Sequence, residues 1–196
     1  MAEAIKSGRN GNTADVDDRN RLITFATTED ESVDFALLGS TFFISSGILE
    51  LTSSNLSYLI YVKNNDIVDW VVREFITDIG PSTGAPGLAL TTQFALAPTG
   101  GTLLSGTELL AANMNIGSPS QLAATINQGG EGFTATGGGL APPALIVSDQ
   151  VRSPFSAGPI IIPPGTAFAF GVTPAAGNTS MFVQFSTVLY RKLGVE

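Results

Sequence analysis

Two stretches, residues 166–172 and 180–191, alternate between large apolar residues and small or polar ones. A period of two indicates β-strands whose two faces differ in burial. The apolar faces hold Phe168, Phe170 and Val172 in the first stretch and Met181, Val183, Phe185 and Leu189 in the second. Pro163-Pro164-Gly165 precedes the first stretch and cannot continue a ladder, because proline lacks the amide donor and glycine favours turns. The chain is therefore predicted to end in a β-meander.

The clearest hairpin predicted from the sequence joins residues 56–63 to residues 67–76 through Asn64-Asn65-Asp66. Both runs are β-branched and aromatic, and the connection has turn composition. Simple alternation puts Val68, Trp70, Val72 and Ile76 on one side of the second strand. We therefore expect Trp70, which is the chain's only tryptophan, to lie in the core.

The rest of the chain consists of short apolar runs separated by turn residues. Strands are predicted at residues 21–27, 33–38, 41–51, 88–96 and 144–147, and loops at residues 80–87 and 98–101. The one helical turn is expected at residues 107–112, with Thr107 as its cap. About ten short strands with almost no helix indicate an all-β protein, an antiparallel β-sandwich that is jelly-roll-like.

Residues 1–20 are polar and cannot form a core of their own, so they are predicted to be an extended N-terminal arm. Residues 21–196 are predicted to form a single β-sandwich domain. The basic residues in and beside the arm are Lys6, Arg9, Arg19 and Arg21. They are the candidate partner-binding residues, on the hypothesis that the arm docks on another subunit. A frayed tail is the alternative.

The composition excludes several kinds of chemistry. The chain has no cysteine and no histidine, so disulfides, thiolate catalysis, Ser-His-Asp triads and His-ligated zinc are impossible. The acidic residues cluster in the arm and at Glu29-Asp30-Glu31, where a solvated turn is expected in place of the carboxylate pair of a glycosidase. We expect no enzyme activity, no catalytic residues, no bound metal and no cofactor.

Three weaker binding motifs in the sequence have plainer interpretations. Asp15-Val16-Asp17-Asp18 could offer oxygens to calcium but lacks the spacing of an EF-hand, which favours a polar turn. The glycines at 129–132 and 137–139 lack the Lys-Ser or Lys-Thr pair of a phosphate loop, so flexible tips or tight β-turns are expected. Polar loop residues could bind carbohydrate, although most aromatic residues fall on predicted core faces.

The charge pattern bears on partners and location. The formal net charge is -8, and only 13% of residues are charged. An acidic chain without a basic cluster is not expected to bind nucleic acid, and a sparsely charged surface suits a protein covered by neighbours. The first residues lack the apolar core of a signal peptide, and no apolar run is long enough to span a bilayer. Synthesis in the cytoplasm and no membrane insertion are expected.

Several segments resemble virion proteins of tailed bacteriophages. They are Ile5-Lys6-Ser7-Gly8 with Asn12, Val16-Asp17-Asp18-Arg19-Asn20-Arg21-Leu22, the strand from Tyr58 to Lys63 that ends at Asn64, Ala97-Pro98-Thr99-Gly100-Gly101 and Asn113-Met114-Asn115. The resemblance covers most of the chain but rests on composition and includes no catalytic residue. It implies a jelly-roll-like subunit that assembles, often as a trimer, on the outside of a capsid.

The sequence thus favours a structural virion protein that decorates a bacteriophage capsid as a cement protein, made in the host cytoplasm and located on the capsid exterior. Its expected partners are the major capsid protein and further copies of itself in a homotrimer. Two alternatives stay open: a neck or tail-fibre subunit that contacts the host, and a carbohydrate-binding β-sandwich module.

Overall fold

The computed structural model describes residues 5–6, 13–16, 22–23, 35–83, 88–140, 144–148, 152–155, 160–177 and 179–192. The chain divides into two compact units, Met1–Val33 and Asp34–Glu196. In the first unit three short strands form an antiparallel sheet in the order β1 (Ile5–Lys6), β2 (Thr13–Val16) and β3 (Leu22–Ile23). Apart from these strands, the predicted arm lies outside the described residues.

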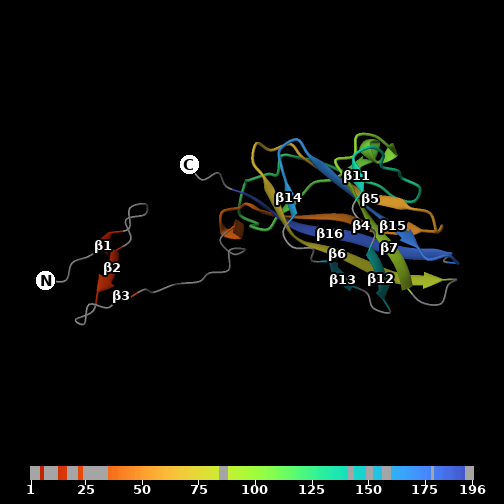
Figure 1. Ribbon diagram of the computed structural model, residues 1–196, viewed down its shortest axis with the longest axis horizontal. Helices are drawn as coiled ribbons and strands as arrows, with labels where there is room; N and C mark the ends of the chain where they lie inside the picture. The colour runs from red at the N-terminus through yellow and green to blue at the C-terminus, as the bar shows by residue number, and fades with distance from the viewer. Residues whose placement is uncertain are drawn as a thin grey trace. The chain divides into compact units, whose positions relative to one another are not determined.

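The second unit contains two antiparallel sheets, which Figure 1 shows with their labels. The first sheet has the order β11-β7-β15-β5-β10-β8, and β12 also pairs with β7. Its strands are β5 (Ser57–Asn64), β7 (Leu88–Leu96), β8 (Thr107–Glu108), β10 (Ala124–Gln128), β11 (Gly139–Leu140), β12 (Ala144–Ser148) and β15 (Ala167–Pro174). Every pairing in this sheet is antiparallel.

The second sheet has the order β13-β6-β16-β4-β9, and β14 also pairs with β6. Its strands are β4 (Thr41–Leu51), β6 (Trp70–Thr83), β9 (Ala112–Asn113), β13 (Arg152–Phe155), β14 (Ile160–Ile162) and β16 (Ser180–Arg191). Because β13 and β14 pair with successive parts of β6, they act together as one interrupted edge strand.

The principal strands pair in a nested order. The first pairs with the last, β4 with β16, and the second with the next to last, β5 with β15. Further in, β6 pairs with β13 and β14, and β7 pairs with β12. This nested pairing across two sheets is the topology of a jelly roll. The predicted all-β sandwich with jelly-roll character is confirmed.

The predicted hairpin and the predicted final meander are both wrong. Strand β5 lies in one sheet and β6 in the other, and β15 and β16 are divided in the same way. Each short turn therefore connects a strand of one sheet to a strand of the other sheet. The two strands that it joins do not pair with each other. Turn composition alone cannot distinguish these outcomes, because both require a short polar connection between two half-buried strands.

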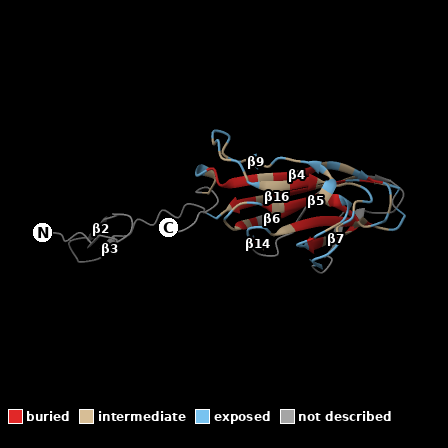
Figure 2. Cartoon of the chain, turned by 90° about the horizontal axis from the view of Figure 1, so that it is seen from above, coloured by how far each residue is buried: buried red, intermediate tan, exposed pale blue. Residues whose placement is uncertain are grey.

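The main core lies between the two sheets and appears in red in Figure 2. Trp70 is fully buried there, as predicted, and so are both predicted C-terminal apolar faces. Five phenylalanines pack edge to face or stacked at its centre, with 4.3 Å between the ring centroids of Phe170 and Phe185. The five are Phe75, Phe94, Phe168, Phe170 and Phe185.

A bulge in β6 changes which side chains face this core. Val188 of β16 lies opposite Glu74 and Leu189 lies opposite Val72, so Arg73 is an extra residue in β6. An extra residue reverses the alternation beyond it. Phe75 therefore enters the core, whereas Ile76, which simple alternation assigns to the same side as Trp70, is buried but outside this core cluster.

A second, smaller cluster covers the opposite face of the β5–β15–β7 sheet. Its buried members are Tyr58, Tyr61, Ala95, Leu103 and Ala169. Leu103 comes from a 3₁₀ helix, η1 (Thr102–Ser105). The helical turn predicted at residues 107–112 is therefore misplaced, because Thr107–Glu108 pairs with β10 as strand β8.

Other local predictions have mixed outcomes. Residues 35–37 form a helical turn where a strand was predicted, and β6 continues through Thr83 into the predicted loop at 80–87. Turns are confirmed at Gly132 and Gly137, with φ of 74° and 75°, whereas Gly139 belongs to strand β11. Within the described part of the chain, no helix is long and apolar enough to cross a membrane.

Candidate interaction site

The predicted partner-binding residues all belong to the first unit. Lys6 lies in β1, and its side chain is outside the described part of the structure. Arg9, Arg19 and Arg21 also lie outside the described residues. Their role in docking stays a prediction.

Within the described residues, no group of three or more acidic side chains is placed to hold a metal ion. Glu131 makes a local contact between two loops. It accepts a hydrogen bond of 2.8 Å from the Thr52 hydroxyl, and hydrogen bonds from Thr52 and Ser53 lower the pKa of its exposed carboxyl. This contact links the loop after β10 to the loop after β4.

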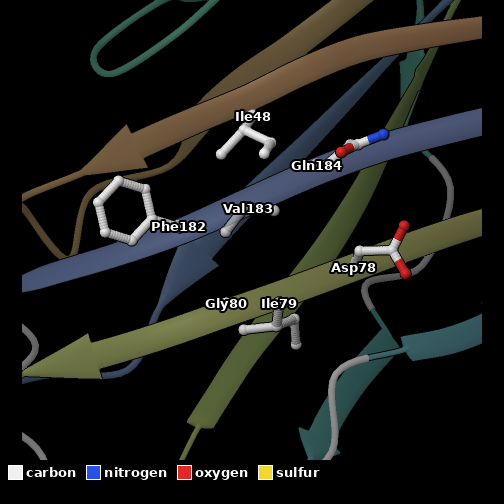
Figure 3. A pocket seen from close by; sticks show the side chains of 7 residues that line it. All are labelled: Ile48, Asp78, Ile79, Gly80, Phe182, Val183 and Gln184. Atoms are coloured by element: carbon white, nitrogen blue, oxygen red, sulfur yellow. The ribbon is translucent and has the colours of Figure 1, made fainter.

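An open apolar hollow lies on the outer face of the second sheet, over β4, β6 and β16 (Figure 3). Its volume is about 410 Å³. It is lined by Ile48, Asp78, Ile79, Gly80, Phe182, Val183 and Gln184. Because three adjacent strands of one sheet supply these residues, the hollow belongs entirely to the second unit.

A glycine and an aromatic residue lie side by side in the lining of the hollow. A Cβ atom at Gly80 would lie 2.9 Å from the Cβ atom of Phe182, so a side chain there would displace the ring. Met181 pairs with Ser82 and Val183 with Ile79, so β6 contributes two residues opposite Phe182. Such a bulge alters the direction of neighbouring side chains.

The hollow has an apolar wall and a polar end. Ile48 is 72% exposed and Phe182 is 39% exposed, whereas Ile79 and Val183 are buried beneath them. Figure 3 places Asp78 and Gln184 together at the end away from the Phe182 ring. The Gln184 amide donates a hydrogen bond of 3.0 Å to the Ser45 hydroxyl. Exposed isoleucine and phenylalanine side chains around one hollow can bind an apolar group of a partner.

Sequence reasoning missed this site, although one signal for it was present. Phe182 alternates with Met181 and Val183, so it falls on the same face of β16 as Gln184. A phenylalanine on the polar face of a strand marks a place where an apolar side chain meets solvent or a partner. Ile48 carried no comparable signal, because its outward direction depends on a bulge in β4.

Comparison with known proteins gives no family. No protein-family model matches the chain, and no curated protein matches it. Among solved structures, the chain is similar to a protein of the empty head of turnip yellow mosaic virus, at 10% sequence identity and a TM-score of 0.20. That similarity covers 80% of this chain and 84% of the viral chain.

Proposed function

We propose that this chain is a structural virion protein that decorates and stabilises a bacteriophage capsid as a cement protein, assembled as a homotrimer. The observation that carries the proposal is the open apolar hollow on an outer sheet face of a jelly roll. It gives a rigid β-sandwich a place to receive an apolar side chain of a shell subunit. The resemblance of the sequence to tailed-phage virion proteins favours a capsid shell subunit as the partner.

A decoration protein needs only a small free energy of binding from each contact. Burying an exposed isoleucine or phenylalanine contributes roughly 1.5–3 kcal/mol before the costs of association. Linked copies bind a repeating shell with an avidity far above that of one contact. A modest hollow, repeated in each subunit of a trimer, is therefore sufficient for stable decoration.

The number of copies per purified particle tests this role. We expect copies in the hundreds, at a fixed ratio to the major shell protein, by quantitative gel densitometry. About a dozen copies would instead place the protein in the neck or tail, where attachment sites are few. An absence from purified particles would exclude the virion role altogether.

Substitutions in the hollow test whether this surface contacts the shell. Phe182→Ser and Ile48→Ser are expected to lower occupancy on particles at least tenfold when each removes about 1.4 kcal/mol or more of binding free energy. Ile161→Ser is the matched control, because Ile161 is 57% exposed on β14 and does not line the hollow. Equal occupancy for all three variants would show that the hollow does not contact the shell.

One observation favours carbohydrate binding as a second candidate. Phe182 is a partly exposed aromatic side chain with Gln184 and Asp78 nearby, and sugar sites combine an aromatic face with polar groups. A glycan array distinguishes the candidates: a reproducible hit that Phe182→Ser abolishes would favour a sugar ligand. The Gln184 amide already donates to Ser45, which leaves the hollow better suited to an apolar group.

A further inference from the structure

The aromatic end of the hollow borders a carboxylate on β4. Figure 3 places the Phe182 ring at the end of the hollow away from Gln184. In the pairing of β4 with β16, Glu50 lies opposite Phe182 and two residues beyond Ile48. Glu50 and Ile48 are both exposed, whereas Leu49 between them packs against the core. Glu50 therefore lies on the same side of the sheet as the hollow, next to its aromatic wall.

This carboxylate is oriented but has no cation beside it in the described structure. The Glu50 Oε1 atom accepts a hydrogen bond of 2.7 Å from the hydroxyl of Ser180, which lies two residues before Phe182 on β16. Among the described side chains, no lysine or arginine forms an ion pair with Glu50. Just beyond β4 the Thr52 hydroxyl donates to Glu131, which brings a second carboxylate to this end of the strand. The negative charge here attracts a cation.

Phe182 differs from the other aromatic residues of the chain in its exposure. Within the described part of the structure it is the only exposed aromatic side chain, at 39%. The face of a phenylalanine ring attracts a cation, most often the guanidinium group of an arginine. Arginine also has an apolar stem and pairs with a carboxylate through two parallel hydrogen bonds. An exposed ring beside an oriented carboxylate therefore fits an arginine side chain better than a neutral one.

We propose that the hollow binds a basic segment of its partner, in which an arginine stacks on Phe182 and pairs with Glu50 while an aliphatic side chain packs against Ile48. Ile48 and Glu50 are two residues apart on one strand, and side chains two residues apart in an extended partner segment have the same spacing of roughly 7 Å. The formal net charge of -8 also favours the encounter with a basic partner. The inference rests on the proposed function, because the partner is the shell subunit that the hollow is proposed to contact.

Peptide binding to the full chain tests this chemistry without a capsid. The probe is acetyl-Gly-Leu-Gly-Arg-Gly-amide, in which leucine and arginine have the proposed spacing, and its affinity is measured by NMR titration of the isotope-labelled protein. We expect a dissociation constant on the order of 1 mM, because two side chains bury little area. The same peptide with glutamine in place of arginine should bind about threefold more weakly, as the loss of one exposed ion pair and one cation–π contact implies.

Glu50→Gln removes the charge but keeps an oxygen that accepts from Ser180, so the fold should be preserved. This variant is expected to bind the arginine peptide about threefold more weakly and to discriminate less between the two peptides. Glu108→Gln is the matched control, because Glu108 is exposed, has the same charge and lies in β8 of the other sheet. Its affinity for the arginine peptide should equal that of the wild-type protein.

Three outcomes would overturn the inference. They are no binding of the arginine peptide up to about 10 mM, equal binding of the arginine and glutamine peptides to the wild-type protein, and an equal loss of affinity in Glu50→Gln and Glu108→Gln. The particle copy number is measured separately. Copies in the hundreds together with no preference for arginine would keep the virion role and reject the basic segment, so the two failures give different results.

Discussion

At the scale of single residues, Asn64 secures the point where the chain crosses from one sheet to the other. It is fully buried at the end of β5. Its amide donates to the Val68 carbonyl at 2.9 Å and to the Ile162 carbonyl at 2.8 Å, and its side-chain oxygen accepts from the Asp66 amide at 2.8 Å. One side chain thus shapes the turn before β6 and ties it to β14.

Replacing Asn64 should therefore be costly. In Asn64→Ala, two carbonyls and one amide lose their partner, which we expect to lower the free energy of unfolding by about 2–4 kcal/mol. Urea unfolding followed by tryptophan fluorescence measures the change. The control is Asn65→Ala, because Asn65 is exposed and its side-chain amide donates to the Thr125 hydroxyl in a surface pair. If Asn64→Ala lowers the free energy of unfolding no more than Asn65→Ala does, the Asn64 side chain does not secure this turn.

Two tyrosines make stability depend on alkaline pH. Burial raises the pKa of Tyr58 and of Tyr61 above its ordinary value. In the unfolded chain both hydroxyls ionise at the ordinary pKa of tyrosine, about 10. Their contribution to stability is thus fully present below about pH 10 and is lost as the pH rises through the higher folded-state pKa.

We expect the urea midpoint of the wild-type protein to fall between pH 9 and pH 11. In the double variant Tyr58→Phe/Tyr61→Phe that fall should be smaller, because phenylalanine does not ionise and lysine deprotonation affects both proteins alike. Identical pH profiles for the two proteins would show that neither tyrosine hydroxyl is more shielded from water in the folded state.

At the scale of an element, a bulge in β4 determines which of its side chains face the core and which face the hollow. Ser45 lies opposite Ser186 and Ile48 lies opposite Gln184, so two residues of β4 face Phe185. The buried Ser46 hydroxyl accepts a hydrogen bond of 2.9 Å from the Phe185 amide within this bulge. The extra residue reverses the alternation and directs Ile48 outward, where it lines the hollow.

Removing the Ser46 hydroxyl should destabilise this bulge. Ser46→Ala leaves the buried Phe185 amide without its acceptor, and a loss of about 1–3 kcal/mol in the free energy of unfolding is expected. Urea denaturation measures this loss, with the dependence of the free energy of unfolding on urea concentration held the same for both proteins. Ser54→Ala serves as the control, because Ser54 is exposed in the loop after β4. If the two variants unfold at the same urea concentration, the hydroxyl does not hold the bulge.

At the scale of the whole molecule, the described sandwich core lies in the second unit. Every buried residue of that core lies between Phe42 and Leu189. Deleting residues 1–20 should therefore leave the thermal unfolding midpoint of the sandwich unchanged. If the arm docks on the shell, the same deletion should lower occupancy on particles. Unchanged occupancy would remove the docking role from Lys6, Arg9 and Arg19.

The sequence by itself determined the class of structure. Alternation with a period of two, frequent Gly and Pro turns and the absence of long helical patterns led to an all-β sandwich, and burial of Trp70 and of the Phe168 and Phe185 faces followed from the same alternation. These features are local: each strand's two faces can be assigned from the residues of that strand alone.

The tertiary structure decided how the strands pair and where the candidate site lies. Whether the turn after Asn64 reverses the chain or crosses the sandwich depends on contacts with Ile162, almost a hundred residues away. The bulges in β4 and β6 depend on register against β16, and they determine that Phe75 faces the core and Ile48 faces the hollow. Register is a property of two strands together, so no single stretch of sequence contains it.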